Sequence, residues 1–143
     1  DQMTRFNISL QDGCEMVFYA IEKAWGGEVF VPKIPSYKIS DVATAIAPTM
    51  VQKVIGIRPG EKLHEEMITS SDSYNTVDLG KYYAILPQKS PYSQYSKEDY
   101  KKAFDGVDVA NGFSYNSGNN SDWETIESLR ELVKIHVDPN FKA

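Results

Sequence analysis

The sequence contains one cysteine, Cys14, and no long apolar run. A single cysteine cannot form an internal disulfide, so a disulfide-stabilised secreted fold is excluded and a reducing, cytoplasmic compartment is expected. No stretch approaches the ~20 apolar residues that span a bilayer. The opening segment also lacks the basic and apolar regions of a secretory signal. We therefore expect a cytoplasmic protein without a membrane partner.

Basic residues are the minority, and two common phosphate-binding motifs are missing. The chain has 15 Lys and Arg against 20 Asp and Glu, a formal net charge of -5, so we expect no nucleic-acid partner. Without a Gly-x-Gly-x-x-Gly fingerprint or a P-loop, the chain is not expected to bind NAD by itself. Cys14, His64 and His136 are too far apart in sequence to predict a metal site or a Cys-His nucleophile.

The remaining composition is that of an ordinary globular domain, with 41% apolar and 24% charged residues in a chain of 143. Helices are predicted over residues 10–25, 41–47, 61–68, 96–104 and 125–137. Strands are predicted over residues 28–32, 51–57, 75–80 and 81–87, and a loop over 114–122. The fold class is therefore a small α/β arrangement of short strand pairs with several helices. It lacks the long β-α-β series of a complete doubly wound sheet.

Local signals mark the ends of several predicted helices. Ser40 is the expected N-cap of the second helix, and Ser96 with Asp99 has capping-box spacing at the start of another. Gly26 and Gly27 are expected to end the first helix in the left-handed conformation.

The segment "YAIEK" places Tyr19 and Lys23 at the Tyr-x-x-x-Lys spacing of short-chain dehydrogenases. In that chemistry the lysine lowers the tyrosine pKa, so that the phenolate acts as a base. Any tyrosine four residues before a lysine on a helix fits this pattern, and no dinucleotide-binding unit precedes it here. We therefore interpret the pair as a structural feature of an amphipathic helix, and we expect no catalytic residue in this chain.

The segment "IRPGEKLHEEM" is chemically more specific. Proline and glycine force a sharp turn after Arg58. A guanidinium suits a bidentate phosphate contact, and the carboxylate of Glu61 can accept hydrogen bonds from ribose hydroxyls. The spacing therefore suits a nucleoside diphosphate. On the residues alone, a solvated helix start with Glu61 near the helix dipole remains the alternative.

Four segments together resemble the UDP-N-acetylglucosamine 4,6-dehydratase (inverting) family of extended short-chain dehydrogenase/reductases: "MTRF", "GGEVFVPKIPSYKI", "IGIRPGEKLHEEMI" and "HVDPNF". The likeness covers nearly all 143 residues. Family members are longer and begin with an NAD(P)-binding Rossmann domain, which carries the glycine-rich loop and the catalytic Tyr-x-x-x-Lys. The resemblance therefore implies that residues 1–143 are the C-terminal, substrate-binding portion. It also implies that the full-length protein is a homo-oligomer that binds NAD(P) in the other domain.

The resemblance implies an activity and a set of substrate contacts. The family converts UDP-N-acetylglucosamine to a 6-deoxy-4-keto sugar nucleotide with inversion at C5, for pseudaminic acid or surface-polysaccharide synthesis. Arg5 and Arg58 would bind the diphosphate of the UDP-sugar, and Glu61 the ribose. Val31 and Lys33 are the expected contacts near the base.

One departure and two alternatives accompany this assignment. Tyr37 stands where many relatives carry methionine, so the sites around it are carried over least securely. The chain could instead be a non-catalytic module that binds a nucleotide sugar or a protein, or the equivalent part of a nucleotide-sugar epimerase. If it is part of a dehydratase, the face that packs on the Rossmann domain should be apolar and exposed.

Overall fold

The computed structural model describes residues 2–88 and 95–143. The chain divides into two compact units, each built from separate segments. The first unit takes in the residues up to Ser9, Ile34–Glu65 and Asn116–Ala143. The second comprises Leu10–Lys33 and Glu66–Tyr115. Within the described residues, no helix is both long and apolar enough to cross a membrane.

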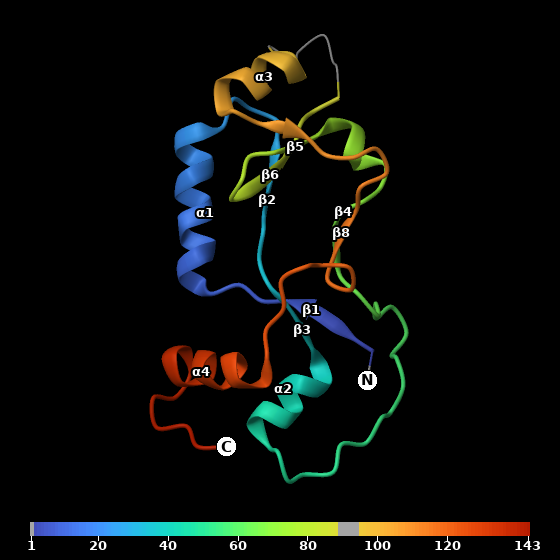
Figure 1. Cartoon of the computed structure of the whole chain (residues 1–143), viewed down its shortest axis with the longest axis vertical. Helices are drawn as coiled ribbons and strands as arrows, with labels where there is room; N and C mark the ends of the chain where they lie inside the picture. The colour runs from blue at the N-terminus through green and yellow to red at the C-terminus, as the bar shows by residue number, and fades with distance from the viewer. Residues whose placement is uncertain (1, 89–94) are drawn as a thin grey trace. The chain divides into compact units, whose positions relative to one another are not determined.

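The first unit joins a two-stranded sheet to a pair of helices. Strand β1 (Thr4–Phe6) pairs antiparallel with β3 (Ser36–Lys38). Helix α2 (Ile39–Ile46) follows β3 and packs against α4 (Ile126–His136), as Figure 1 shows. Arg130 of α4 fixes this contact, because its Nε donates to the Ala45 carbonyl at 3.2 Å.

The second unit is built around an antiparallel sheet with the order β2-β6-β5-β7. Its strands are β2 (Val29–Pro32), β6 (Tyr82–Ile85), β5 (Thr76–Asp78) and β7 (Val107–Asp108). Its other elements are α1 (Leu10–Lys23), the short 3-10 helix η1 (Asp72–Asn75) and α3 (Lys97–Phe104). A further short strand, β4 (Glu66–Ile68), pairs with β8 (Tyr115–Asn116). The core of the unit comprises Val77, Ala84, Leu86 and Tyr100.

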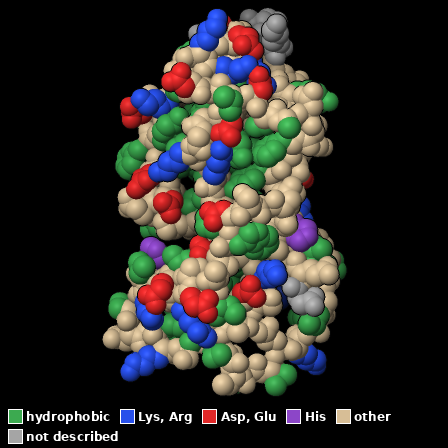
Figure 2. Space-filling view, in the orientation of Figure 1, with side chains coloured by type: hydrophobic (Ala, Val, Ile, Leu, Met, Phe, Trp, Pro, Cys, Tyr) green, Lys and Arg blue, Asp and Glu red, His purple; other side chains and the backbone are tan. Residues whose placement is uncertain are grey.

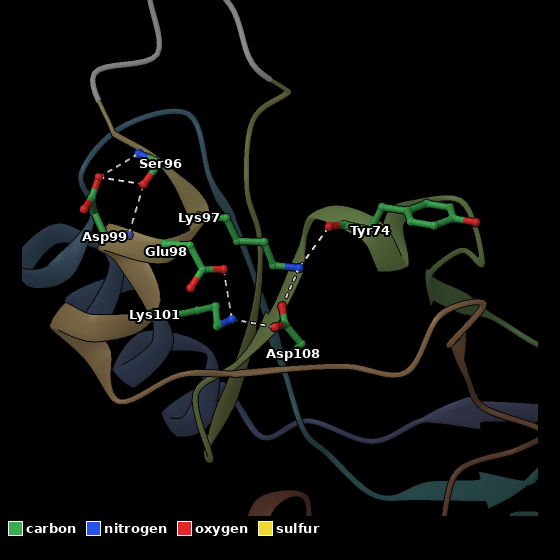
Figure 3. Close-up of polar contacts among 7 residues, drawn as sticks. All are labelled: Tyr74, Ser96, Lys97, Glu98, Asp99, Lys101 and Asp108. Carbon is green, nitrogen blue, oxygen red and sulfur yellow. Dashed lines mark hydrogen bonds and ion pairs between the residues drawn. The ribbon is translucent and has the colours of Figure 1, made fainter.

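Charged side chains anchor α3 in this unit (Figure 3). Ser96 accepts the Asp99 N–H at 3.1 Å, and the Asp99 carboxylate accepts the Ser96 N–H at 3.3 Å, so the predicted capping box is present. Asp108 of β7 pairs with Lys97 at 2.8 Å and with Lys101. The charges of this cluster are paired with one another and serve to attach the helix.

Most of the predicted elements are confirmed. The helices at residues 10–25, 41–47, 96–104 and 125–137 correspond to α1, α2, α3 and α4. The strands at residues 28–32, 75–80 and 81–87 correspond to β2, β5 and β6. Gly26 and Gly27 have positive φ of 115° and 88°, but α1 already ends at Lys23, so the glycines turn the chain beyond the helix and do not form the predicted left-handed cap.

Four further predictions about local structure are wrong. Residues 51–57 alternate in polarity like a strand, but they form no strand and are exposed, with Val51 at 95%. Residues 61–68 have helix propensity, yet they end in β4 because tertiary contacts outweigh a weak preference. Ser40 lies inside α2, whose N-cap is Lys38 in extended conformation. The loop predicted at residues 114–122 also contains strand β8.

Exposed apolar side chains gather in each unit. Helix α1 exposes Leu10, Val17, Phe18 and Ile21, and the irregular segment 50–57 exposes four β-branched residues and Met50. In the first unit, α2, residues 50–57, Met3 and Leu63 line an open, mostly apolar groove of about 710 Å³. On the face shown in Figure 2, acidic and basic side chains are interspersed, so no single-sign surface forms there.

Candidate functional site

Arg58 and Glu61 occupy the two ends of a tight turn in the first unit. The Glu61 N–H donates to the Arg58 carbonyl at 3.0 Å, and Gly60 has φ of 82°, as a type II turn with proline at its second position requires. The Glu61 carboxylate in turn accepts the Arg58 N–H at 3.1 Å. The turn is exposed, and the Arg58 guanidinium extends from it with no recorded partner among the described residues. The predicted sharp turn is therefore present, although no strand precedes it.

Arg5 lies on the other side of the Glu61 carboxylate. Its Nη2 pairs with Glu61 Oε1 at 3.9 Å, and its Nε pairs with Glu65 Oε1 at 3.4 Å. Its Nη1 donates to the Thr4 carbonyl at 2.6 Å and to the Leu63 carbonyl at 3.4 Å. The guanidinium is half-buried, and most of its N–H donors have protein partners. The Nη2 contact with Glu61 is the longest of these contacts and therefore the weakest.

A chain of buried hydroxyls ties these residues to the body of the first unit. Thr4 Oγ1 contacts His64 Nδ1 at 2.8 Å and Ser117 Oγ at 2.7 Å. Ser117 also accepts the Glu65 N–H at 2.9 Å through its hydroxyl and donates its own N–H to the Glu65 carbonyl at 2.8 Å. The strand that carries Arg5 and the segment that carries Glu61 and Glu65 are thus joined through side chains.

Val31 and Lys33 belong to the second unit. Val31 is 4% exposed in the middle of β2, so its side chain has little surface to offer a ligand. Lys33 is engaged, since its Nζ lies 2.6 Å from Asp78 Oδ1 and 4.5 Å from the centroid of the Tyr83 ring. Their contact with a base stays a prediction.

Tyr19 and Lys23 lie on α1, where the tyrosine packs into an aromatic cluster. Its ring centroid is 5.3 Å from that of Phe30 and 4.6 Å from that of Tyr82. Burial raises the pKa of Tyr19, although Lys23 opposes this shift. Lys23 pairs with Glu22 at 2.8 Å. A raised tyrosine pKa is the reverse of what a phenolate base needs, which favours the structural interpretation of the pair.

Comparison with known proteins places this chain in a family. A family model described as "Polysaccharide biosynthesis protein" matches residues 1–87, which include Arg5, Arg58 and Glu61. This match covers more than half of the chain. The chain belongs to the polysaccharide biosynthesis protein family.

Individual relatives extend the match across the chain. UDP-N-acetylglucosamine 4,6-dehydratase (inverting) from Campylobacter jejuni is 46% identical over 133 residues, 92% of this chain and 40% of the relative. UDP-glucose 4-epimerase from Rickettsia felis is 35% identical over 137 residues, 92% of this chain and 38% of the relative. The X-ray structure of Pen from Bacillus thuringiensis aligns with a TM-score of 0.70 and 25% identity over 92% of this chain and 38% of that one. The chain spans about two fifths of the length of these proteins.

These matches confirm the resemblance and the fold class. The mixed helices and small antiparallel sheets fit the corresponding part of a longer polysaccharide biosynthesis protein. Tyr37, at which the resemblance leads us to expect methionine in many relatives, is the cross-strand neighbour of Arg5 in the β1–β3 pair. The departure therefore lies beside the predicted site.

Several residues of this arrangement carry no sequence signal for a site. Thr4, Glu65 and Ser117 are ordinary polar residues, and Ser117 lies in an asparagine-rich stretch that resembles a surface loop. Ser117 is 52 residues from Glu65 and 113 from Thr4, so only the folded chain brings them together.

Proposed function

We propose that this chain is the nucleotide-sugar-binding part of an inverting UDP-N-acetylglucosamine 4,6-dehydratase that serves bacterial surface-polysaccharide or pseudaminic acid synthesis. One observation carries the proposal: the Glu61 carboxylate lies between the Arg58 backbone and the Arg5 guanidinium in the first unit. Two arginines on either side of a carboxylate can supply cations for a diphosphate and an acceptor for the hydroxyls of the adjoining ribose. The 46% identity to the Campylobacter dehydratase supports this choice of substrate.

Arg58 is the principal diphosphate ligand in this proposal. Its exposed guanidinium can form a bidentate contact without breaking a recorded interaction. Arg5 is the second cation and reaches the diphosphate through Nη2, whose pair with Glu61 is long at 3.9 Å. Glu61 then exchanges that weak pair for ribose hydroxyls while it keeps the Arg58 N–H.

The nicotinamide cofactor that the resemblance implies does not fit the residues present. The single Tyr-x-x-x-Lys pair has its tyrosine packed against Phe30 and Tyr82 and its pKa raised, so it does not suit a cofactor-assisted base. No group of three His, Cys, Asp or Glu side chains in the described part of the chain could hold a metal ion. We therefore assign NAD(P) binding and catalysis to the remainder of the full-length protein.

The proposal extends to assembly and location. The exposed apolar side chains of α1 and of residues 50–57 form surface that a soluble protein normally covers, which supports contact with the Rossmann domain or a second copy in a homo-oligomer. The single exposed thiol, Cys14, is compatible with a reducing cytoplasm.

A second candidate function is the equivalent part of a UDP-glucose 4-epimerase. The 35% identity to the Rickettsia felis epimerase over 92% of this chain favours it specifically. Both functions require the same UDP contacts, so they differ in the sugar that the complete protein transforms.

Calorimetric titration of the 143-residue chain with UDP, UMP, uridine and ADP tests the proposal. We expect UDP to bind most tightly, UMP more weakly because it lacks the second phosphate, and uridine weakest of the three. ADP at the affinity of UDP would refute recognition of the uracil. Uridine at the affinity of UDP would refute the diphosphate site.

A further inference from the structure

The geometry points to a hydrogen-bonded relay, Glu65 N–H to Ser117 to Thr4 to His64, that positions Arg5 and the Glu61–Glu65 segment for ligand binding. Thr4 and Ser117 are 3% and 0% exposed, so each hydroxyl is cut off from water and depends on its protein partners. This inference rests on the proposed nucleotide site and adds to it four residues that touch no ligand.

The relay has a definite direction. Ser117 Oγ accepts the Glu65 N–H at 2.9 Å, and its other recorded neighbour among the described residues is Thr4 Oγ1 at 2.7 Å. We assign the Ser117 hydroxyl hydrogen to Thr4, because only this arrangement gives the buried Ser117 hydroxyl an acceptor among these contacts. The Thr4 hydrogen then points to His64 Nδ1 at 2.8 Å, so that nitrogen accepts and the imidazole proton lies on Nε2.

Gly118 fixes the other side of the His64 ring. A Cβ built on Gly118 would lie 2.6 Å from His64 Nδ1 and 2.7 Å from its Cγ, which is closer than real Cβ atoms approach. The backbone of Gly118 is itself held, because its N–H donates to Asn116 Oδ1 at 2.9 Å. Only glycine lets the ring lie against this backbone and reach Thr4.

Both ends of the relay lead directly to the charged cluster. Thr4 precedes Arg5, whose Nη1 donates to the Thr4 carbonyl at 2.6 Å. At the other end, Ser117 holds both the N–H and the carbonyl of Glu65, whose carboxylate pairs with Arg5 Nε at 3.4 Å. A shift of either end changes the position of the guanidinium against Glu61 and Glu65. These residues therefore act as positioning residues.

Thr4→Val tests the relay, because it keeps the shape of threonine and removes the hydroxyl. Thr76→Val is the matched control, since Thr76 is equally buried and its hydroxyl donates to the Asp72 carbonyl at 2.8 Å in the second unit. We expect Thr4→Val to weaken UDP binding about tenfold, because it removes the hydrogen bonds of the Thr4 hydroxyl to His64 and Ser117 and so loosens Arg5, and Thr76→Val to leave it unchanged. Thr4→Ser, which restores the hydroxyl, should recover the affinity lost in Thr4→Val.

Gly118→Ala provides a second variant, which leaves the four relay residues themselves unsubstituted. Gly13→Ala is its control, because nothing lies within 4 Å of the Cβ added there. We expect Gly118→Ala to displace His64 and weaken UDP binding, and Gly13→Ala to do neither. Equal UDP affinity in Gly118→Ala, Thr4→Val and the wild type would overturn the inference.

Nuclear magnetic resonance gives a readout that does not depend on UDP. Long-range proton–nitrogen spectra should show wild-type His64 with its proton on Nε2, and a mixture of tautomers in Thr4→Val. The Arg5 Nε–H should exchange with water faster in Thr4→Val and Ser117→Ala than in the wild type. Unchanged exchange and tautomer in folded variants would refute the relay. Failure of the wild type to bind UDP, with both signatures present, would refute only the nucleotide site.

Discussion

Glu61 is the residue on which the chemistry of the site depends. One carboxylate oxygen accepts the Arg58 N–H and closes the turn, and the other lies 3.9 Å from Arg5. The same carboxylate thus shapes the turn that presents Arg58 and partly neutralises the second cation. In the proposed site a diphosphate would compete with Glu61 for Arg5, whereas the Arg58 guanidinium has no partner among the described residues to give up.

Arg58→Ala should weaken UDP binding roughly ten- to a hundredfold, because a charge-assisted contact is worth about 1.5–3 kcal/mol. Arg58→Lys should recover only part of this loss, since an ammonium cannot form the forked contact. Lys62→Ala is the control, as Lys62 is an exposed cation four residues away on the same segment. Isothermal calorimetry measures the affinities. Equal losses of UDP affinity in Arg58→Ala and Lys62→Ala would show that Arg58 contributes only positive charge and makes no specific contact with the diphosphate.

Glu61→Gln should cost less than Arg58→Ala, because an amide oxygen can still accept the Arg58 N–H and one ribose hydroxyl. The loss of the negative charge also releases Arg5 for the diphosphate, which offsets part of the weakened ribose contact. Titration with UDP and with 2′-deoxy-UDP separates the two effects. The variant should discriminate less between these ligands than the wild type does, and unchanged discrimination would contradict the ribose role.

At the scale of the elements, local signals predicted the helices α1 to α4 and the strands β5 and β6. Ser96 and Asp99 form the predicted capping box because both partners lie within one turn of chain. The irregular structure of residues 51–57 could not be predicted, because their polarity alternates as in a strand although the segment pairs with no strand among the described residues. Likewise, Arg58 and Glu61 could be proposed from residue type and spacing together with the family resemblance. Ser117 and Gly118 were not, because their partners lie more than fifty residues away in sequence.

Stability of α3 should depend on pH through Asp99. The hydrogen bond from the Ser96 side chain, and to a smaller extent that from the Ser96 backbone, holds the pKa of Asp99 below its usual range. Because the pKa of Asp99 is lower in the folded than in the unfolded state, its ionised carboxylate stabilises the fold at pH values above the unfolded-state pKa of about 3.9. This contribution is lost as the pH falls through the folded-state pKa. The Asp99→Asn variant should therefore approach wild-type stability as the pH falls.

Urea unfolding at about pH 6 and about pH 3 measures the effect as a change in the unfolding free energy. The difference between wild type and Asp99→Asn should be smaller at the lower pH. Glu127→Gln, in the first turn of α4, controls for the removal of one acidic group near a helix start. A difference that is the same at both pH values would contradict a role for the ionised Asp99 cap.

At the scale of the whole molecule, each unit contains part of the predicted set. Arg5, Arg58 and Glu61 belong to the first unit, which is assembled from three separate segments, and Val31 and Lys33 belong to the second. The chain spans about two fifths of its dehydratase relatives, and its Tyr19–Lys23 pair is structural in this account.

The 143-residue chain should therefore bind UDP-N-acetylglucosamine without converting it. Incubation with the sugar nucleotide and either NAD or NADP, followed by mass spectrometry for the dehydrated 4-keto product, tests this expectation. A Campylobacter jejuni dehydratase provides the positive control. Product above background from the chain alone would show that its own residues carry out the chemistry.

Hydrogen–deuterium exchange with and without UDP tests the central claim most directly, because it locates the ligand on the chain. UDP should slow amide exchange at residues 58–65 and around Arg5, and Arg58→Ala should reduce this protection at the same UDP concentration. Protection confined to the second unit, or equal protection in Arg58→Ala, would contradict the assignment of the diphosphate to this turn.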